Sequence, residues 1–240
     1  MTQVTVYFAI LAALSGSAAA AAETATPPAV GLFLDFETSP SPAIEKSTEA
    51  EVERILEPSG MRLAWRMLRS MRTDESFESV VVIRFHGACG IPEGAVRDRI
   101  GQAFPPLAST QIVDGHVLPF TDIECSMIAR YIAPLVSAAS GTDRDEIIGR
   151  ALGRVVAHEL YHVFSGSRSH APDGVARAYH TRRDLVAKEF NFQEAESEMF
   201  RAIRTRIDSM KGAPAAAPVE TSAPGNSGDS GDPGEVSTAR

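Results

Sequence analysis

Two histidines and a glutamate occur in the sequence at a spacing that suits metal chemistry. His158, Glu159 and His162 form an HExxH pattern. Residues four apart lie on one face of an α-helix, so both imidazoles can reach the same ion. Glu159 is offset by one residue, where its carboxylate can hold a metal-bound water and take its proton. The alternative, two core histidines beside a surface glutamate, would leave buried imidazoles without a compensating partner. The pattern therefore predicts a hydrolytic metal site.

The segment around this pattern has the periodicity of a buried helix. Thr142 and Asp145 form a predicted N-terminal capping box, and Gly166 provides the stop. One apolar stripe repeats every four residues, at Ile148, Leu152, Val156, Leu160 and Phe164. Ala151 and Val155 form a second stripe, so the helix is apolar on two sides. Such a helix is expected inside the protein.

The stretch that begins at His158 resembles the zincin metallopeptidases. It is similar to an expanded form of the metzincin signature HExxHxxGxxH, with Gly166 and His170 in the same order. Seven residues separate His162 from His170, where metzincins have five. The stretch also resembles small exported bacterial zincin-like proteins. The resemblance implies a Zn²⁺ cofactor held by His158, His162 and His170, with Glu159 as the general base.

The third ligand has a rival in the sequence. Gluzincins use a downstream glutamate, and three candidates occur here: Glu194, Glu196 and Glu198. Their cluster is also typical of the acidic first turn of a helix. His170 follows the helix stop by four residues, in a loop rich in turn-forming residues. We therefore expect His170 to be the ligand.

Two aromatic residues after the motif are further candidates. Tyr179 or His180 could stabilise the developing oxyanion, because a tyrosine or histidine does so in several zincins. A surface position without a catalytic role is the simpler interpretation of both.

The chain ends are expected to lie outside the fold. Residues 1–22 contain a short apolar run followed by alanines, which is typical of a secretory signal peptide. Residues 23–29 are interpreted as a linker, and 30–211 as one zincin-like metallopeptidase domain. Residues 212–240 are rich in Pro, Ala, Gly and Ser and are predicted to be a disordered tail. In an exported protein, Cys89 and Cys125 most simply form one disulfide.

We expect an α+β fold, with a twisted mixed sheet on helices and the site in a cleft below an edge strand. Apolar patterns predict strands at 31–36, 61–67 and 79–85, and shorter strand pieces around the turn Asp114-Gly115 within 108–120. Besides the helix that carries His158 and His162, they predict helices at 44–56, 93–104, 122–132 and 193–207. The segment 111–120 is expected to offer an edge strand to an extended peptide.

Composition excludes several classes of function. The formal net charge is -8 and no Lys/Arg-rich block occurs, which argues against nucleic-acid binding. After residue 22 no apolar run is long enough for stable insertion in a membrane. Nothing in the sequence indicates an oligomeric state.

The expected activity is zinc-dependent hydrolysis of peptide bonds outside the cytoplasm, in the periplasm or after secretion. The expected partner is a peptide or protein substrate, and an endopeptidase is favoured over an exopeptidase. The alternative is a non-catalytic binding module that zinc stabilises.

Overall fold

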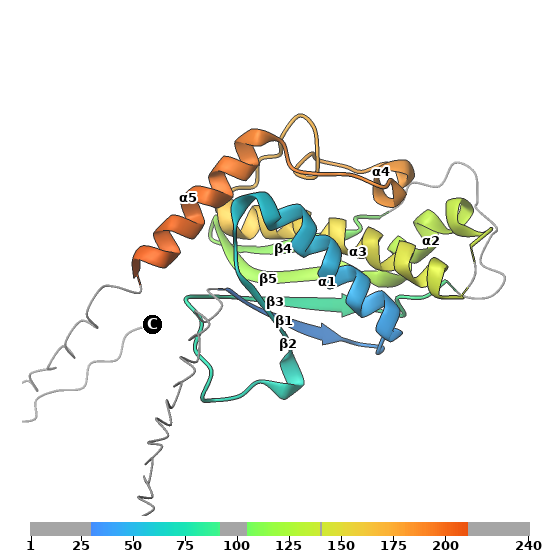
Figure 1. Ribbon diagram of the computed structural model, residues 1–240, viewed down its shortest axis with the longest axis horizontal. Coiled ribbons are helices and arrows are strands. Elements are labelled where there is room, and N and C mark those ends of the chain that lie inside the picture. Colours follow the sequence, from blue (N-terminus) through green and yellow to red (C-terminus); the bar gives the residue numbers. More distant parts are fainter. Residues whose placement is uncertain (1–29, 92–104, 140, 211–240) are drawn as a thin grey trace, which may run out of the picture.

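The computed structural model describes residues 30–91, 105–139 and 141–210 (Figure 1). The expected signal peptide at 1–22, the linker at 23–29, the helix at 93–104 and the tail at 212–240 lie outside this part. Their boundaries stay predictions.

A five-stranded mixed sheet forms the base of the described structure. Its strands are β1 (Val30–Phe36), β2 (Leu63–Met67), β3 (Ser79–His86), β4 (Ala108–Val113) and β5 (His116–Glu124). Their order is β2-β1-β3-β5-β4, so β3 is central and β4 is an edge strand. Neighbouring strands are parallel except β4, which runs antiparallel to β5. The expected mixed sheet is confirmed.

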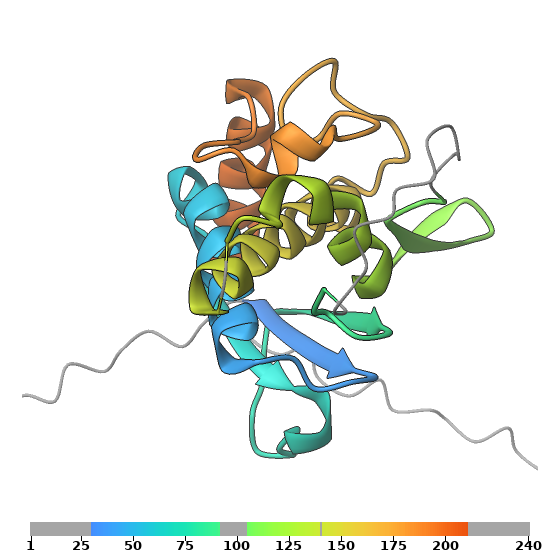
Figure 2. The same cartoon turned by 90° about the vertical axis from the view of Figure 1, so that its right-hand side faces the viewer.

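Five α-helices accompany the sheet in the described residues. They are α1 (Pro42–Leu56), α2 (Cys125–Val136), α3 (Gly141–Ser165), α4 (Arg182–Val186) and α5 (Glu194–Met210). Figure 2 shows α1 and α3 over one face of the sheet, with α4 and α5 farther out. The side chains of Val81, Ile83 and Phe85 alternate along β3 and are buried. This arrangement of sheet and helices confirms the α+β class. None of the described helices combines the length and apolar character needed to cross a bilayer.

The central helix is α3, as its apolar repeat predicts. Ile148, Leu152, Val156 and Leu160 are all buried, and Gly166 ends the helix with a positive φ of 62°. The helix begins at Gly141, one residue before the expected cap. Asp145, expected to take part in that cap, instead accepts a hydrogen bond from Ser41 at 2.6 Å, at the start of α1.

Helices α1 and α3 approach each other through two glycines. A Cβ atom on Gly149 would lie 2.5 Å from the carbonyl oxygen of Ile44, and one on Gly153 would lie 2.7 Å from that of Thr48. Real Cβ atoms do not come so close, so only glycine fits at either position.

The structure corrects the expected helix at 122–132. Strand β5 continues to Glu124, and the helix begins at Cys125. In β5 the segment 120–124 pairs with β3, and Thr121 and Ile123 are fully buried. This alternation is the signature of a strand, which the apolar residues of the following helix obscured.

The expected edge strand also needs correction. The edge is β4, whereas residues 116–120 belong to β5, and Phe120 pairs with Val82 of β3. The turn between the two strands is where the sequence predicts it, with positive φ at Asp114 and Gly115.

Helix α4 was not predicted. Thr181 and Asp184 form its capping box, and a helix of five residues is too short to show a period. Asp184 thus has a structural role and also pairs with Arg177.

Candidate metal centre

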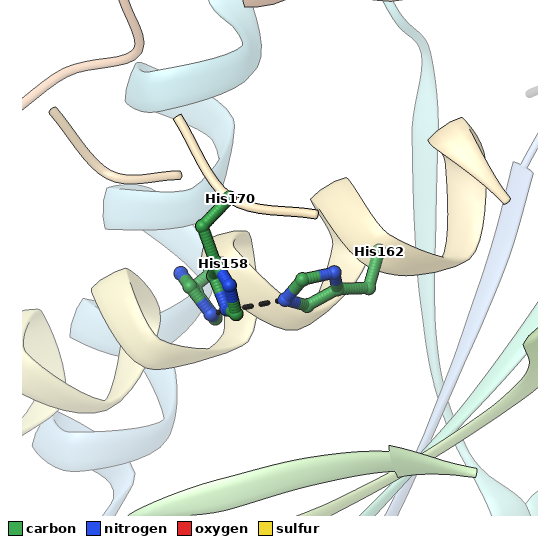
Figure 3. A group of neighbouring side chains, drawn as sticks. All are labelled: His158, His162 and His170. Carbon is green, nitrogen blue, oxygen red and sulfur yellow. Dashed lines mark hydrogen bonds between the residues drawn. The ribbon is translucent and has the colours of Figure 1, made fainter. Parts of the chain in front are cut away.

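The three predicted histidines come together at the C-terminal part of α3 (Figure 3). His158 and His162 lie on the helix, one turn apart, and His170 comes from the loop that follows. One nitrogen from each ring can be chosen so that all three lie within 4.8 Å of one another. His158 and His162 are largely buried, whereas His170 is exposed.

The rival glutamates do not belong to this group. Glu194 lies on α5 with its side chain 75% exposed and contacts Arg201. Glu196 accepts a hydrogen bond from the backbone N–H of Gln193 at 3.0 Å. The geometry thus places His170, and none of the glutamates, beside the two helical histidines.

Backbone carbonyls orient the two helical rings. His158 Nδ1 lies 2.8 Å from the carbonyl oxygen of Val175, and His162 Nδ1 lies 2.8 Å from that of Ser167. A carbonyl can only accept, so each Nδ1 carries a proton and each neutral ring has its lone pair on Nε2. Metal-binding histidines are commonly oriented by such contacts.

The two Nε2 atoms face each other at 3.2 Å. With both Nδ1 atoms protonated, two lone pairs would repel at this distance unless a cation or a proton lies between them. Two nitrogen ligands about 2.0–2.1 Å from a tetrahedral zinc are separated by about 3.3–3.4 Å. The pair of nitrogens therefore fits a zinc ion.

Burial favours the uncharged rings that a metal needs. Desolvation lowers the pKa of His158 to about 3, and it also lowers the pKa of His162. The hydrogen bonds to Val175 and Ser167 act in the opposite direction but are weaker. Both rings are thus neutral near pH 7, with lone pairs available for coordination.

Glu159 lines a cavity together with His158, one of the three histidines. Desolvation raises the pKa of its carboxyl to about 7, and a hydrogen bond from Thr110 of β4 partly offsets the rise. The hydroxyl of Thr110 lies 2.6 Å from Glu159 Oε2. Sequence reasoning missed Thr110, because only the packing of β4 on α3 brings it here.

The cavity beside Glu159 measures about 460 Å³ and lies between the edge strand and the helices. Ala108 of β4 and Tyr131 of α2 form parts of its wall. Val155, His158 and Glu159 contribute from α3, and residues 177–180 also line it. The expected cleft next to an edge strand is therefore present.

Tyr179 and His180 both line this cavity but differ in burial. Tyr179 is 77% exposed, in keeping with the surface position expected of it. His180 is partly buried. Its Nε2 lies 2.9 Å from the Val175 carbonyl, which therefore accepts hydrogen bonds from both His180 and His158.

A buried arginine anchors the segment that carries these groups. Arg154 lies one turn before His158 and is 0% exposed. Its Nε donates to Glu51 of α1 at 2.6 Å, and its other nitrogens donate to the carbonyls of Asp184 and Ala187. Glu51 also binds Arg54, which reaches Asn191. An arginine on the buried side of an apolar helix is the sequence signal that could have revealed this anchor.

The second predicted pair is also joined. Cys89, in the loop after β3, forms a disulfide with Cys125, the first residue of α2. The bond ties the central strand to the helix that contributes Tyr131 to the cavity wall.

No protein-family model matches the sequence, and no curated protein matches it. Solved structures are similar to this chain, among them two from archaea. The archaemetzincin from Methanopyrus kandleri has 14% identity and a TM-score of 0.44, over 74% of this chain and 96% of that chain. A zinc-dependent peptidase from Methanocorpusculum labreanum has 10% identity and a TM-score of 0.41, over 71% of this chain and 99% of that chain. Similarity this low carries no functional argument, so function has to be inferred from the side chains of this chain.

Proposed function

We propose that the protein is a zinc-dependent peptidase, with His158, His162 and His170 as ligands and Glu159 as the general base. The observation that supports this most is the pair of Nε2 atoms 3.2 Å apart, each on a ring whose Nδ1 is held by a carbonyl. His170 supplies a third nitrogen close by, and Glu159 lines a cavity together with His158. Three protein ligands beside an acid–base carboxylate are typical of catalytic zinc sites.

Zinc bound at these nitrogens would act as a Lewis acid that polarises the scissile carbonyl and acidifies a water. The Glu159 carboxylate takes a proton from the attacking water and then gives a proton to the leaving amine. A carboxyl with a pKa of about 7 is suited to both steps, because it exchanges protons readily near neutral pH.

Cleavage within a peptide, rather than at its end, is part of the proposal. Among the described residues, strand β4 has one unpaired edge beside the cavity, where an extended chain can add as a further strand. Among the described residues that line the cavity, the arginine is Arg177. It pairs with Asp184 and donates a hydrogen bond to the carbonyl of Tyr179. It is therefore not free to bind the terminal carboxylate of a substrate.

We further propose that the protein acts outside the cytoplasm, in the periplasm or after secretion. The leader-like residues 1–22 motivate this location. The disulfide between Cys89 and Cys125 supports it, because such bonds persist in oxidising compartments.

The test compares Glu159→Gln with the wild type in zinc content and in cleavage of a peptide library, with and without a chelator. We expect one zinc per chain in both, and a loss of about 10²- to 10⁴-fold in kcat for the variant, because the general base is gone. The matched control is Glu198→Gln, which makes the same substitution at an exposed glutamate. Wild-type rates in Glu159→Gln would contradict the mechanism. One tightly bound zinc without cleavage of any peptide would favour the non-catalytic binding module.

A further inference from the structure

We propose that Thr110 is a positioning residue for Glu159, a role that rests on the proposed peptidase function. Thr110 lies on the edge strand β4, 49 residues before Glu159 in the sequence. Its hydroxyl holds one oxygen of the Glu159 carboxylate, so that the other oxygen is left for the reaction.

The geometry assigns the hydroxyl proton of Thr110 to the carboxylate. Thr110 Oγ1 is 2.6 Å from Glu159 Oε2 but 3.5 Å from the backbone oxygen of Glu159. Hydrogen bonds to a carboxylate are short and strong, whereas contacts at 3.5 Å are weak. A hydroxyl has a single proton, which therefore goes to Oε2.

This contact matters because Glu159 is only 5% exposed. Burying a carboxylate without a hydrogen bond costs free energy, and a glutamate side chain can adopt several rotamers. Within the described part of the chain, Thr110 is the one hydrogen-bond partner of this carboxylate. The contact thus selects one rotamer and fixes the plane of the carboxylate before substrate arrives.

The sheet in turn determines the place of Thr110. Residues 108–110 pair regularly with residues 121–123 of β5, and Thr110 lies opposite Thr121. The register shifts directly after this pair, between Thr110 and Ile112. Irregularities of this kind often lie next to active sites, where they direct a side chain. Thr110 is therefore the last residue of β4 that pairs with β5 before the register shift.

The test removes the hydroxyl and keeps the shape. Thr110→Val is isosteric and suits a strand, and Thr110→Ala, which also lacks the hydroxyl, is measured beside it in case valine does not fold. We expect kcat to fall about 10- to 100-fold, as for residues that orient catalytic groups, with KM and zinc content unchanged. Thr110→Ser keeps the hydroxyl and is expected to retain wild-type kcat.

Thr121→Val is the matched control. Thr121 lies opposite Thr110 and is fully buried, and its hydroxyl has no hydrogen-bond partner among the described residues. The same substitution there removes a hydroxyl that does not touch Glu159, so kcat is expected to stay at the wild-type value.

Crystal structures of the zinc-loaded wild type and the two hydroxyl-free variants provide a readout besides activity. We expect the Glu159 carboxylate to adopt a different rotamer, or several, when the hydroxyl of Thr110 is absent. Each of three results would overturn the proposal: an unchanged rotamer of the Glu159 carboxylate, wild-type kcat in Thr110→Val, or a loss of kcat in Thr110→Ser. If the wild type cleaves no peptide, the proposed function fails, and the rotamer of Glu159 still decides the role of Thr110.

Discussion

At the scale of single residues, the centre consists of side chains that the sequence reveals and of backbone groups that it does not. The spacing of His158 and His162 predicts a shared ion, because two residues one helical turn apart are neighbours in any α-helix. The carbonyls of Val175 and Ser167 orient these rings, yet every residue has a carbonyl. Thr110 is equally invisible in the sequence, because its contact depends on how β4 packs against α3.

The position of His170 leads to a prediction about the third ligand. His170→Ala is expected to weaken zinc binding by at least about 100-fold, because loss of a ligand exceeds the usual effect of residues behind the ligands. The separate changes of Glu194, Glu196 and Glu198 to alanine are expected to leave zinc affinity unchanged, since none of them belongs to the histidine group. Competition with a chromogenic chelator measures all four affinities.

A wild-type zinc affinity in His170→Ala, together with a loss in one of the glutamate variants, would reverse this assignment. The site would then follow the gluzincin pattern, in which a second helix supplies the third ligand.

At the scale of elements, helix α3, which carries His158 and His162, packs closely against α1, the first helix of the described chain. The two glycines on α3 leave room for backbone oxygens of α1. This contact aligns the middle of α3, and the C-terminal part of the helix carries His158 and His162. The packing of two helices thus helps to place the histidines relative to the sheet.

Gly153→Ala should therefore destabilise the fold. Its Cβ would lie 2.7 Å from the carbonyl oxygen of Thr48, and overpacking of this kind costs about 1–3 kcal/mol. Chemical denaturation measures the change in the free energy of unfolding. Gly90→Ala is the control, because a Cβ there meets no atom within 4 Å. Equal stability of the two variants would show that α1 can move away from α3 without cost.

Periodicity reveals the long elements and fails for the short ones. The helix around Leu152 and the strand around Ile83 were predicted nearly to their ends, because each repeats its pattern several times. The junction at 122–125 was misread, since three residues of strand followed directly by helix show no complete period of either. Helix α4 could not be predicted from periodicity for the same reason, although Thr181 and Asp184 form a recognisable cap.

At the scale of the whole molecule, one disulfide joins the sheet to the helices. The bond between Cys89 and Cys125 closes a loop over a sequence separation of 36 residues. Export would allow this bond to form and persist.

We accordingly predict that the mature protein begins between residues 18 and 25 and contains no free thiol. Cleavage after the small residues of the leader is the expected cause of the first property, and oxidation of Cys89 and Cys125 is the cause of the second. Intact-mass analysis of the native protein, before and after alkylation without reduction, checks both. Retention of Met1, or two alkylated cysteines, would contradict the proposed location.

The buried ion pair between Arg154 and Glu51 bears on the order in which the molecule folds. Its two residues are 103 positions apart in the sequence, and the neighbouring contact of Arg54 with Asn191 spans 137 positions. Contacts between such distant residues are costly in chain entropy, and topologies rich in them fold slowly. These contacts anchor the segment that holds the rings of His158 and His180. We therefore expect the chain to gain high affinity for zinc only late in folding. If the chain is exported as proposed and crosses the membrane unfolded, it would acquire its metal after translocation.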